Sequence, residues 1–502
     1  MKIYNSIVSL ILKKRNQRIQ LFIDQPHKVQ EKLRHYLINK AKNTEFGKTY
    51  DFKSINNLKD FSERIPLSTY EDLEHYIVKM RAGNQNILWP SRIKWFAKSS
   101  GTTGNKSKYI PVSKESIADC HYKGGKDLLA IYCSNYPAKN IFNGKSVMLG
   151  GSHSISKLSS KMKEGDLSAI IMEQLPFWVR MQQSPKLTIA LMDDWEEKIE
   201  LMTEQAIHQN VSSLSGVPSW TLVFAKKILE KTGKKNLHEV WPNFELYMHG
   251  GINFEPYRKK FEELFPKGIN YIESFNASEG YFGIQDNPNK NDLLLMLDFG
   301  IYYEFILLKN ALKNKPSVVS LSEVKLGEDY EMVITTNAGL WRYRIGDTVR
   351  FTKLHPYRFV ITGRTKHNLN VFGEELMIHN AEKALQKVCT DLHLEVLEYT
   401  AAPKFTGTNG KGCHEWILEF KNAPKDLQKF RYSFDQTLKN LNSDYEAKRF
   451  KNMVLEMPIL HIASKNLFFK WMKNKGKLGG QNKVPRLSNE RKFIEELLKL
   501  NH

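Results

Sequence analysis

The amino-acid sequence predicts an α/β fold made of a large N-terminal domain and a smaller α+β C-terminal domain. A chain of 502 residues usually divides into two or more domains, because a single hydrophobic core stops growing well below that length. Between about residues 140 and 290, short apolar runs alternate with helical stretches, which is typical of a largely parallel sheet flanked by helices. From about Leu293 onward, short strands follow one another directly, which indicates a small, antiparallel and barrel-like part.

The N-terminal region is expected to be helical. Apolar residues from Ile3 to Ile11 recur at helical spacing and predict an amphipathic helix, which either packs on the protein's own core or touches a membrane beside the basic run Lys13–Arg15. The stretch Ile7–Leu12 is short and no small-residue cleavage site follows it, so a secretion signal is not predicted. No stretch reaches the roughly 18 apolar residues of a membrane span. The sequence therefore predicts a cytoplasmic protein without a transmembrane segment.

In the alternating region, candidate strands end in loops of small or polar residues. Ligands bind outside the carboxyl ends of the strands in an open parallel sheet, so these loops mark the expected binding site. Helical stretches such as Trp220–Leu229 and Glu255–Leu264 lie between the strands. The candidate strands are Val147–Leu149, Ser212–Leu214, Phe244–Met248 and Ile269–Phe275.

A domain boundary is predicted at about Lys366, where the run Gly363–Asn368 interrupts the strands. The prediction gives an N-terminal domain of residues 1–366 and a C-terminal domain of residues 367–502. The antiparallel strands expected before the boundary are Leu293–Met296, Tyr302–Leu307, Glu331–Thr335, Trp341–Arg344, Val349–Thr352 and Arg358–Thr362. The elements expected after it are helices near Met377–Cys389, Asp426–Leu441 and Asn489–Leu500, with strands near Glu395–Ala401, His414–Phe420 and Val454–Leu460.

The most distinctive segment is Lys98–Lys108, which carries five hydroxyl side chains, two glycines and three lysines between two apolar strands. Glycines let successive N–H groups turn toward one point, and such groups form an anion-binding concavity. The hydroxyls add donors and the lysines add positive charge. The segment predicts a loop that binds nucleotide phosphates, although it lacks the Walker spacing, and the alternative is a solvated hairpin turn. The candidate phosphate-binding residues are Ser99, Ser100, Gly101, Thr102, Thr103 and Gly104.

A second candidate motif is Asn276–Gly280, which follows a predicted strand and contains one carboxylate, Glu279. Magnesium is often held by one or two carboxylates together with phosphate oxygens and waters. Glu279 is therefore a predicted metal ligand, and the alternative is a helix cap or a surface glutamate.

A third motif is Gly339–Asp347, in which Asp347 follows a predicted strand and a glycine. The Asp347 carboxylate can accept hydrogen bonds from both hydroxyls of a ribose, whereas the alternative is a turn aspartate. Downstream, Arg364 follows Gly363 and offers a guanidinium fork for ribose or phosphate.

Read in order, these motifs resemble the adenylate-forming superfamily and, more narrowly, the auxin-responsive Gretchen Hagen family of acyl acid amido synthetases. The resemblance covers most of the chain, and its strength lies in the ordered set rather than in any single motif. The segments that carry it are Thr44–Gly47, Ile65–Asp72, Ser99–Gly104, Ala277–Gly280, Leu340–Asp347 and Gln481–Arg486.

The resemblance implies that the protein uses ATP and Mg²⁺ to join a small carboxylic acid to an amino acid through an acyl-adenylate. It implies that Ser99–Gly104 hold the phosphates and that Asp347 binds ribose, with Arg364 nearby. Asn276, Ala277, Ser278 and Glu279 are expected to border the adenine and the magnesium ion. Such chemistry needs positioning and charge neutralisation rather than a protein nucleophile.

The resemblance also assigns a role to Lys483, in the run Gln481–Arg486 of the predicted mobile domain. A flexible lysine on such a domain can reach the forming bond and then withdraw, and the alternative is a surface lysine in a basic stretch. The run Asn368–Glu375 is more similar to the acyl-CoA synthetases, so CoA stays open as an acceptor in place of the amino acid.

The chain carries a formal net charge of +21 and four scattered cysteines. The lysines are spread along the whole chain, which favours a generally basic surface over dedicated nucleic-acid binding, and no specific nucleic-acid partner is predicted. A basic nucleic-acid-binding protein remains the alternative from another functional class. The cysteines form no Cys-x-x-Cys pair and fit reduced thiols.

Overall fold

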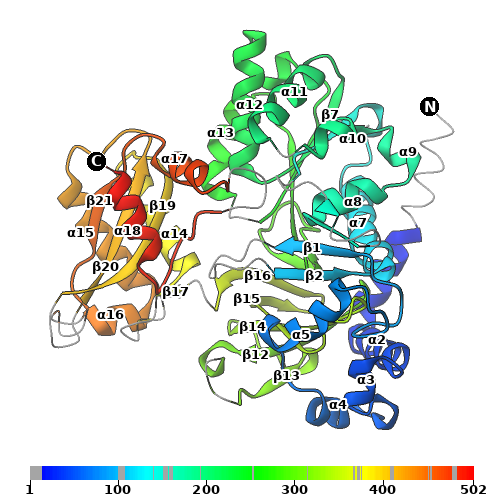
Figure 1. The fold of residues 1–502 in the computed structure, drawn as a ribbon. Helices are drawn as coiled ribbons and strands as arrows, with labels where there is room; N and C mark the ends of the chain where they lie inside the picture. The colour runs from blue at the N-terminus through cyan, green and yellow to red at the C-terminus, as the bar shows by residue number, and fades with distance from the viewer. Residues whose placement is uncertain are drawn as a thin grey trace. The chain divides into compact units, whose positions relative to one another are not determined.

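A computed structural model gives the fold of the chain (Figure 1). The structure describes residues 14–99, 108–138, 141–150, 156–157, 162–192, 194–251, 254–311, 313, 315–365, 368–369, 374, 376–406, 412–449, 452, 455–477 and 483–501. These residues divide into two compact units. The first unit comprises the described residues of Met1–Ile345 and Arg350–Val360, and the second those of Gly346–Val349, Ile361–Leu478 and Asn482–His502.

The first unit begins with helices, as the sequence predicts, although the predicted amphipathic helix at Ile3–Ile11 lies outside the described residues. A helix over residues 14–24 leads into α2. The helices that follow are α2 (Pro26–Ala41), α3 (Glu45–Thr49), α4 (Leu58–Arg64), α5 (Tyr70–Arg81), α6 (Lys114–Ser116), α7 (Tyr122–Asn135), α8 (Leu167–Gln174), α9 (Phe177–Arg180), α10 (Leu187–Ala190), α11 (Trp195–Ile207), α12 (Pro218–Thr232) and α13 (Arg258–Leu264).

Among the described residues, the main sheet has twelve strands. Their spatial order is β13 (Val318–Ser320), β12 (Ile301–Leu307), β14 (Asp329–Thr336), β15 (Tyr343–Leu354), β16 (Tyr357–Arg364), β11 (Leu293–Leu295), β10 (Gly280–Ile284), β9 (Asn270–Ala277), β8 (Leu246–His249), β7 (Val211–Ser215), β3 (Lys145–Met148) and β6 (Gln183–Ser184). The strands β3, β7, β8 and β9 pair in parallel, which confirms the strand series predicted from the alternating pattern.

The antiparallel strands continue this sheet, because β9 pairs in parallel with β8 on one side and antiparallel with β10 on the other. One prediction here is wrong: Trp341–Arg344 and Val349–Thr352 are not two separate strands, since β15 runs without a break from Tyr343 to Leu354. Arg342 adopts φ +43° just before the strand begins, whereas Gly346 permits φ +79° inside it.

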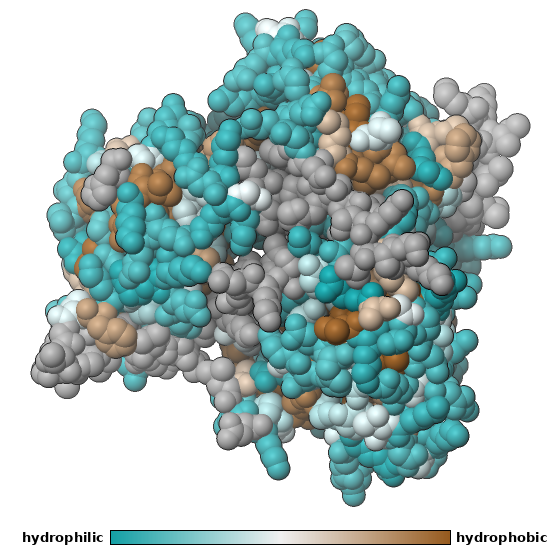
Figure 2. All heavy atoms as spheres, in the orientation of Figure 1, coloured by the Kyte–Doolittle hydropathy of each residue, from teal (hydrophilic) through white to brown (hydrophobic). Residues whose placement is uncertain are grey.

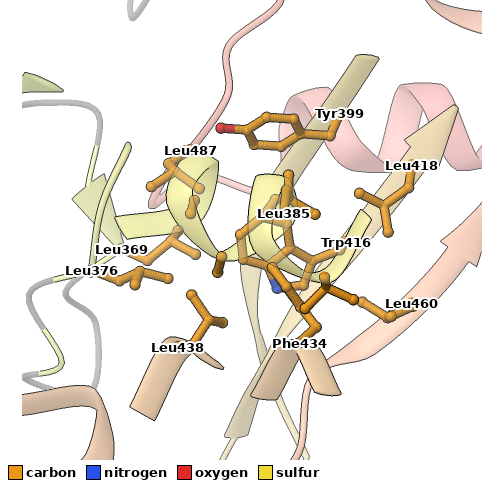
Figure 3. Close-up of a cluster of buried hydrophobic side chains, with 14 of the residues drawn as sticks. Leu369, Leu376, Leu385, Tyr399, Trp416, Leu418, Phe434, Leu438, Leu460 and Leu487 are labelled. Carbon is orange, nitrogen blue, oxygen red and sulfur yellow. The ribbon is translucent and has the colours of Figure 1, made fainter. Parts of the chain in front are cut away.

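The second unit has its own three-stranded sheet among the described residues, in the order β19 (Val396–Phe405), β20 (Gly412–Phe420) and β21 (Ile459–Ile462). Its helices are α14 (Ile378–Asp391), α15 (Leu427–Leu441), α16 (Ser443–Arg449), α17 (Leu467–Asn474) and α18 (Lys492–Leu500). Figure 3 shows the core, where Trp416 and Leu418 of β20 meet Leu385 of α14 and Phe434 of α15. The predicted α+β pattern is confirmed, while α16 and α17 were not predicted.

The four cysteines are free thiols, with Cys120 and Cys413 buried. Within the described residues, no helix combines the length and the apolar character that crossing a membrane requires.

Candidate functional site

A β-hairpin frames the predicted phosphate loop. β1 (Trp95–Ser99) pairs antiparallel with β2 (Lys108–Val112), and Ser99 lies opposite Lys108 in the register. The strand–loop–strand prediction is therefore confirmed at both ends of the loop. Residues Ser100 to Gly104, together with the side chain of Ser99, lie outside the described residues. Their role in phosphate binding stays a prediction.

Helix α5 braces this hairpin. The Tyr70 hydroxyl accepts a hydrogen bond from the Tyr109 backbone N–H at 3.0 Å. The Arg81 guanidinium lies 3.6 Å from the centre of the Tyr109 ring and pairs with Glu164 at 2.6 Å. Glu164 belongs to β5 (Lys163–Gly165), which pairs in parallel with β1. The hairpin is thus fixed to the body of the first unit from two sides.

A second hairpin carries the predicted metal ligand. β9 extends through Ala277, which pairs with Gly280 of β10, so Ser278 and Glu279 form a two-residue turn. Asn276 is exposed, Ser278 is buried and Glu279 is half-buried. A Cβ at Gly280 would lie 2.5 Å from the Ile301 Cδ1 atom, so Ile301 would have to shift. Gly280 is thus closely packed at the start of β10, directly after the turn that presents Glu279.

His121 is a residue of this region that the sequence analysis missed. It ends a short π-helical stretch (Ile117–His121) between α6 and α7, and its Nδ1 lies 3.2 Å from the Asn276 Oδ1. Burial lowers the pKa of His121 to about 4, so its ring is neutral at pH 7. In the tautomer that carries the proton on Nδ1, the ring donates a hydrogen bond to the Asn276 Oδ1. The sequence carries no signal for this contact, because it joins two segments far apart along the chain.

The neighbour of His121 fixes the same hairpin by a second contact. The Tyr281 backbone N–H donates to the Cys120 Sγ at 3.2 Å. Burial raises the pKa of the Cys120 thiol to about 12, so it stays protonated and has no nucleophilic role at neutral pH. Since α6 follows β2 directly, the chain that leaves the phosphate-loop hairpin contacts the hairpin of Glu279.

Three of the resemblance motifs pack together as scaffold in the first unit. Ser68 forms an isolated parallel bridge with Tyr343, and its hydroxyl donates to the Trp341 carbonyl at 2.7 Å. The Trp341 ring stacks on Phe46 with a centroid distance of 6.0 Å. These contacts join the segments Thr44–Gly47, Ile65–Asp72 and Leu340–Arg344. Because Ser68 is used in this way, the capping box of α5 is formed by the next residue, Thr69, with Asp72.

The buried side chain of Arg342 also joins these segments. Its guanidinium pairs with Glu304 through two hydrogen bonds of 2.9 Å and also donates to the carbonyls of Ser62 and Ile65, each at 2.7 Å. The side chains of Arg342 and Glu304 are only 5% and 4% exposed. Burial raises the pKa of Glu304, although the adjacent guanidinium opposes that effect. The arginine of the motif thus has a structural role.

Asp347 lies within β15, which corrects the prediction that it follows the end of a strand. The strand continues because Gly346 takes the positive φ and its carbonyl accepts from the Thr365 N–H at 2.7 Å. Asp347 itself is buried. Arg364 ends β16 just before Thr365, and β15 and β16 are neighbours in the main sheet. The parts of these strands that carry positions 347 and 364 belong to the second unit. The side chain of Arg364 lies outside the described residues.

Lys483 also belongs to the second unit, at the start of a described segment fixed to β19. The Ala401 N–H donates to the Arg486 carbonyl at 2.9 Å, and the Ser488 N–H donates to the Ala401 carbonyl at 3.0 Å. The Thr400 hydroxyl donates to the Pro485 carbonyl at 2.5 Å. Val484 is buried, whereas Lys483 is exposed. The segment therefore holds the backbone next to Lys483 while its side chain faces water.

The described residues contain no group of three or more His, Cys, Asp and Glu side chains that could hold a metal ion by themselves. A single carboxylate such as Glu279 fits Mg²⁺, which commonly takes the rest of its ligands from phosphates and waters.

Comparisons with known proteins agree with this picture. Three models of one family match the chain: the GH3 family N-terminal domain at residues 15–269, the central domain at residues 294–364 and the C-terminal domain at residues 379–492. A jasmonoyl–L-amino acid synthetase of Nicotiana attenuata is 24% identical, over 91% of this chain and 90% of its own length. An indole-3-acetic acid-amido synthetase of Arabidopsis thaliana is 23% identical, over 78% of this chain and 84% of its own.

Solved structures show the same fold. The GH3.15 acyl acid amido synthetase in complex with 2,4-DB superposes with a TM-score of 0.79 at 18% identity, over 98% of this chain and 96% of the other. A 2-hydroxyisobutyryl-CoA ligase superposes with a TM-score of 0.60 at 12% identity, over 97% and 92% of the two chains. The resemblance drawn from the sequence motifs is confirmed, and the chain belongs to the GH3 family.

Proposed function

We propose that this protein is an ATP-dependent ligase that joins a small carboxylic acid to an amino acid through an acyl-adenylate. The observation that carries the proposal is the family match along the N-terminal, central and C-terminal parts of the chain. Relatives over most of its length are named as synthetases that act on an acyl acid and an amino acid. These names favour an amine over the thiol of CoA as the acceptor.

The reaction proceeds in two balanced steps. A carboxylate oxygen attacks the α-phosphorus of ATP, a P–O bond forms, and pyrophosphate leaves with the electron pair of the broken P–O bond. The amine nitrogen then attacks the acyl carbon, AMP leaves, and the nitrogen loses a proton to solvent or base. Neither step needs a protein nucleophile, so the protein contributes position and charge.

Residues of the first unit are proposed to hold the nucleotide phosphates and the metal. Ser99 to Gly104 would hold the phosphates, since the β1–β2 hairpin brings the two ends of their loop together. The turn of Ser278 and Glu279 would border the adenine together with Asn276 and Ala277. Bound through Glu279, Mg²⁺ would neutralise charge on the phosphates.

Residues of the second unit are proposed to act on the ribose and on the forming acyl-adenylate. Asp347 would accept hydrogen bonds from the ribose hydroxyls, and Arg364 on the neighbouring strand would contact the ribose or a phosphate. Lys483 would stabilise the forming acyl-adenylate through its positive charge. The absence of a specific nucleic-acid partner and a cytoplasmic location both remain predictions.

The test is pyrophosphate release from MgATP across a panel of carboxylic acids, with and without amino acids or CoA, and with mass spectrometry of the product. An amide product in the presence of an amino acid is expected, and a thioester in its place would favour the CoA alternative. Glu279→Gln should raise the magnesium concentration needed for half-maximal rate, while the exposed control Glu263→Gln should not. If calorimetry with magnesium shows no nucleotide binding to the wild type, the enzyme proposal fails.

A further inference from the structure

The first unit contains a pocket that none of the proposed catalytic residues lines. Its volume is about 210 Å³, below the roughly 300–1,000 Å³ of pockets for drug-sized ligands, so it has room only for a small molecule. Lys145, at the start of β3, and Gln183, at the start of β6, are among its lining residues, as is Gln209 just before β7. The pocket therefore lies beside the amino ends of parallel strands. Asn276 and Glu279, by contrast, lie at the carboxyl end of a strand of the same sheet.

The charged residues that line this pocket are all basic. They are Lys145, Arg180 and Lys186, and the described lining contains no acidic side chain. The Lys145 ammonium donates to the Met181 carbonyl at the pocket, whereas Arg180 and Lys186 are exposed. A guanidinium and an ammonium at an exposed rim favour a ligand with a carboxylate group.

The same pocket has apolar walls. Met172 and Leu175 come from the end of α8, and Leu187 and Ala190 come from α10. Met172 and Ala190 are buried, at 5% and 3% exposure. Figure 2 shows hydrophobic side chains on the surface in the region of α10. The pocket therefore combines a charged rim with an apolar interior, which suits an amphipathic anion rather than a purely polar one.

Two side-chain amides in the lining have unused hydrogen-bonding capacity. The Oε1 atoms of Gln183 and Gln209 are buried and accept no hydrogen bond from any residue that the structure describes. A buried acceptor without a partner is unfavourable, so a ligand with an N–H or O–H donor would favour rotation of either amide toward the pocket. Gln205, also in the lining, is by contrast satisfied by the Lys186 N–H and by Ser184.

We infer that this pocket binds an N-acyl amino acid. The inference rests on the proposed function, because this class of molecule would be its product. An N-acyl amino acid offers a carboxylate for Arg180 and Lys186, an amide N–H for the Gln183 or Gln209 oxygen, and an acyl group for the wall of Met172, Leu187 and Ala190. The protein then senses the product class at a site separate from the residues proposed to form it.

The test is calorimetric titration of the full-length protein with N-benzoylglycine in the absence of ATP. Arg180→Ala should weaken binding at least tenfold, and Ala190→Trp, which fills the pocket, should abolish it. The matched control Lys226→Ala removes an exposed cation on α12 and should leave binding unchanged. Benzoate, which lacks the N–H, and the methyl ester of N-benzoylglycine, which lacks the charge, should each bind at least tenfold more weakly.

Two outcomes would overturn the inference. They are no binding of N-benzoylglycine to the wild type, or equal affinity for the wild type, Arg180→Ala and Lys226→Ala. If Ala190→Trp does not fold by circular dichroism, Arg180→Ala together with Lys186→Ala decides the matter. Pyrophosphate release is measured on the same proteins. If binding of N-benzoylglycine depends on Arg180 but no pyrophosphate is released, the pocket inference is supported and the proposed function is refuted. The two failures can therefore be distinguished.

Discussion

The two hairpins of the first unit and the Lys483 segment of the second unit hold their polar residues in different ways. The β9–β10 hairpin fixes Glu279 in a two-residue turn between paired strands, with His121 and Cys120 behind it. The segment after Lys483 is held on the second unit by the Thr400 hydroxyl at Pro485, by backbone hydrogen bonds to Ala401 and by the burial of Val484 and Leu487, whereas Lys483 itself is exposed.

This difference matches the roles proposed for the two regions. A group that binds phosphate-bound metal gains from a fixed geometry, because it need not reorganise when the ligand arrives. A lysine that acts in only one of the two steps benefits from a long and flexible side chain, because the ammonium group can then approach the reacting atoms and withdraw. The comparison predicts that substitutions behind the first region change stability, whereas substitution of Lys483 changes rate.

The largest effect is expected from the buried ion pair behind the motif Leu340–Arg344. Arg342→Met leaves the Glu304 carboxylate buried without its partner, which should lower the free energy of unfolding by about 3–5 kcal/mol. Denaturant unfolding followed by tryptophan fluorescence measures this loss. The matched control is Arg350→Met, since Arg350 pairs with Asp329 at a partly exposed site, with side chains 34% and 20% exposed. The control should lose less than about 1 kcal/mol. Equal losses for the two variants would contradict the assigned role of Arg342.

A somewhat smaller effect is expected from His121, through pH. Its pKa is about 4 in the folded protein against 6.5 for the free side chain. Between these values the unfolded chain binds the proton first, so stability is fully present above about pH 6.5 and falls as the pH drops toward 4. The contribution lost is about 3 kcal/mol, at 1.36 kcal/mol per pH unit.

The measurement is the melting temperature of the wild type and His121→Gln from pH 7.5 to pH 4.5. The variant should show a shallower decline, whereas His208→Gln, which removes an exposed imidazole, should follow the wild type. Parallel curves for all three proteins would show that His121 does not titrate as the burial indicates.

Much of the fold, and the strand–loop–strand pattern around the phosphate loop, could be predicted because the signals are local. Strands that end in small-residue loops predicted β3, β7, β8 and β9, and the composition of Lys98–Lys108 predicted a loop between two strands. These features depend on short-range backbone preferences and on the alternation of strands with helices. The strand β10, which completes the hairpin of Glu279, was not predicted.

The features that escaped prediction depend on distant partners. In α2 the polar Gln30 is buried, whereas the aromatic Tyr36 is 40% exposed. Gln30 is buried because its amide donates to the carbonyls of Leu297 and Ile301 and accepts from the Tyr303 N–H. A polar residue with such partners cannot be told from a surface glutamine by its spacing. The contact of His121 with Asn276 is hidden for the same reason.

The next prediction concerns the exposed Lys483 of the second unit. Lys483→Ala should slow acyl-adenylate formation about 100-fold or more, the range for losing one charge-stabilising donor in a transition state. Affinity for ATP should change little, because the phosphates and ribose are assigned to other residues. Single-turnover adenylate formation beside ATP binding separates the two effects. Lys492→Ala removes an exposed cation at the start of α18 and is the control. If Lys483→Ala forms adenylate at the wild-type rate, Lys483 is a surface lysine without a role in this step.

The smallest effect is expected at Asp347. This residue belongs to the same unit as the exposed Lys483 but is buried in a strand. Asp347→Ala removes an acceptor for two ribose hydroxyls, where each charge-assisted hydrogen bond is worth about 1.5–3 kcal/mol. Affinity for ATP should therefore fall at least about tenfold. Asp347→Asn keeps the shape and one acceptor oxygen, so its loss should be smaller. Calorimetry with ATP and with 2′,3′-dideoxy-ATP makes the test specific, since the dideoxy nucleotide should bind the wild type and Asp347→Ala equally. If the Asp347→Ala protein folds and binds ATP as tightly as the wild type, Asp347 does not bind the ribose and has only a structural role in β15.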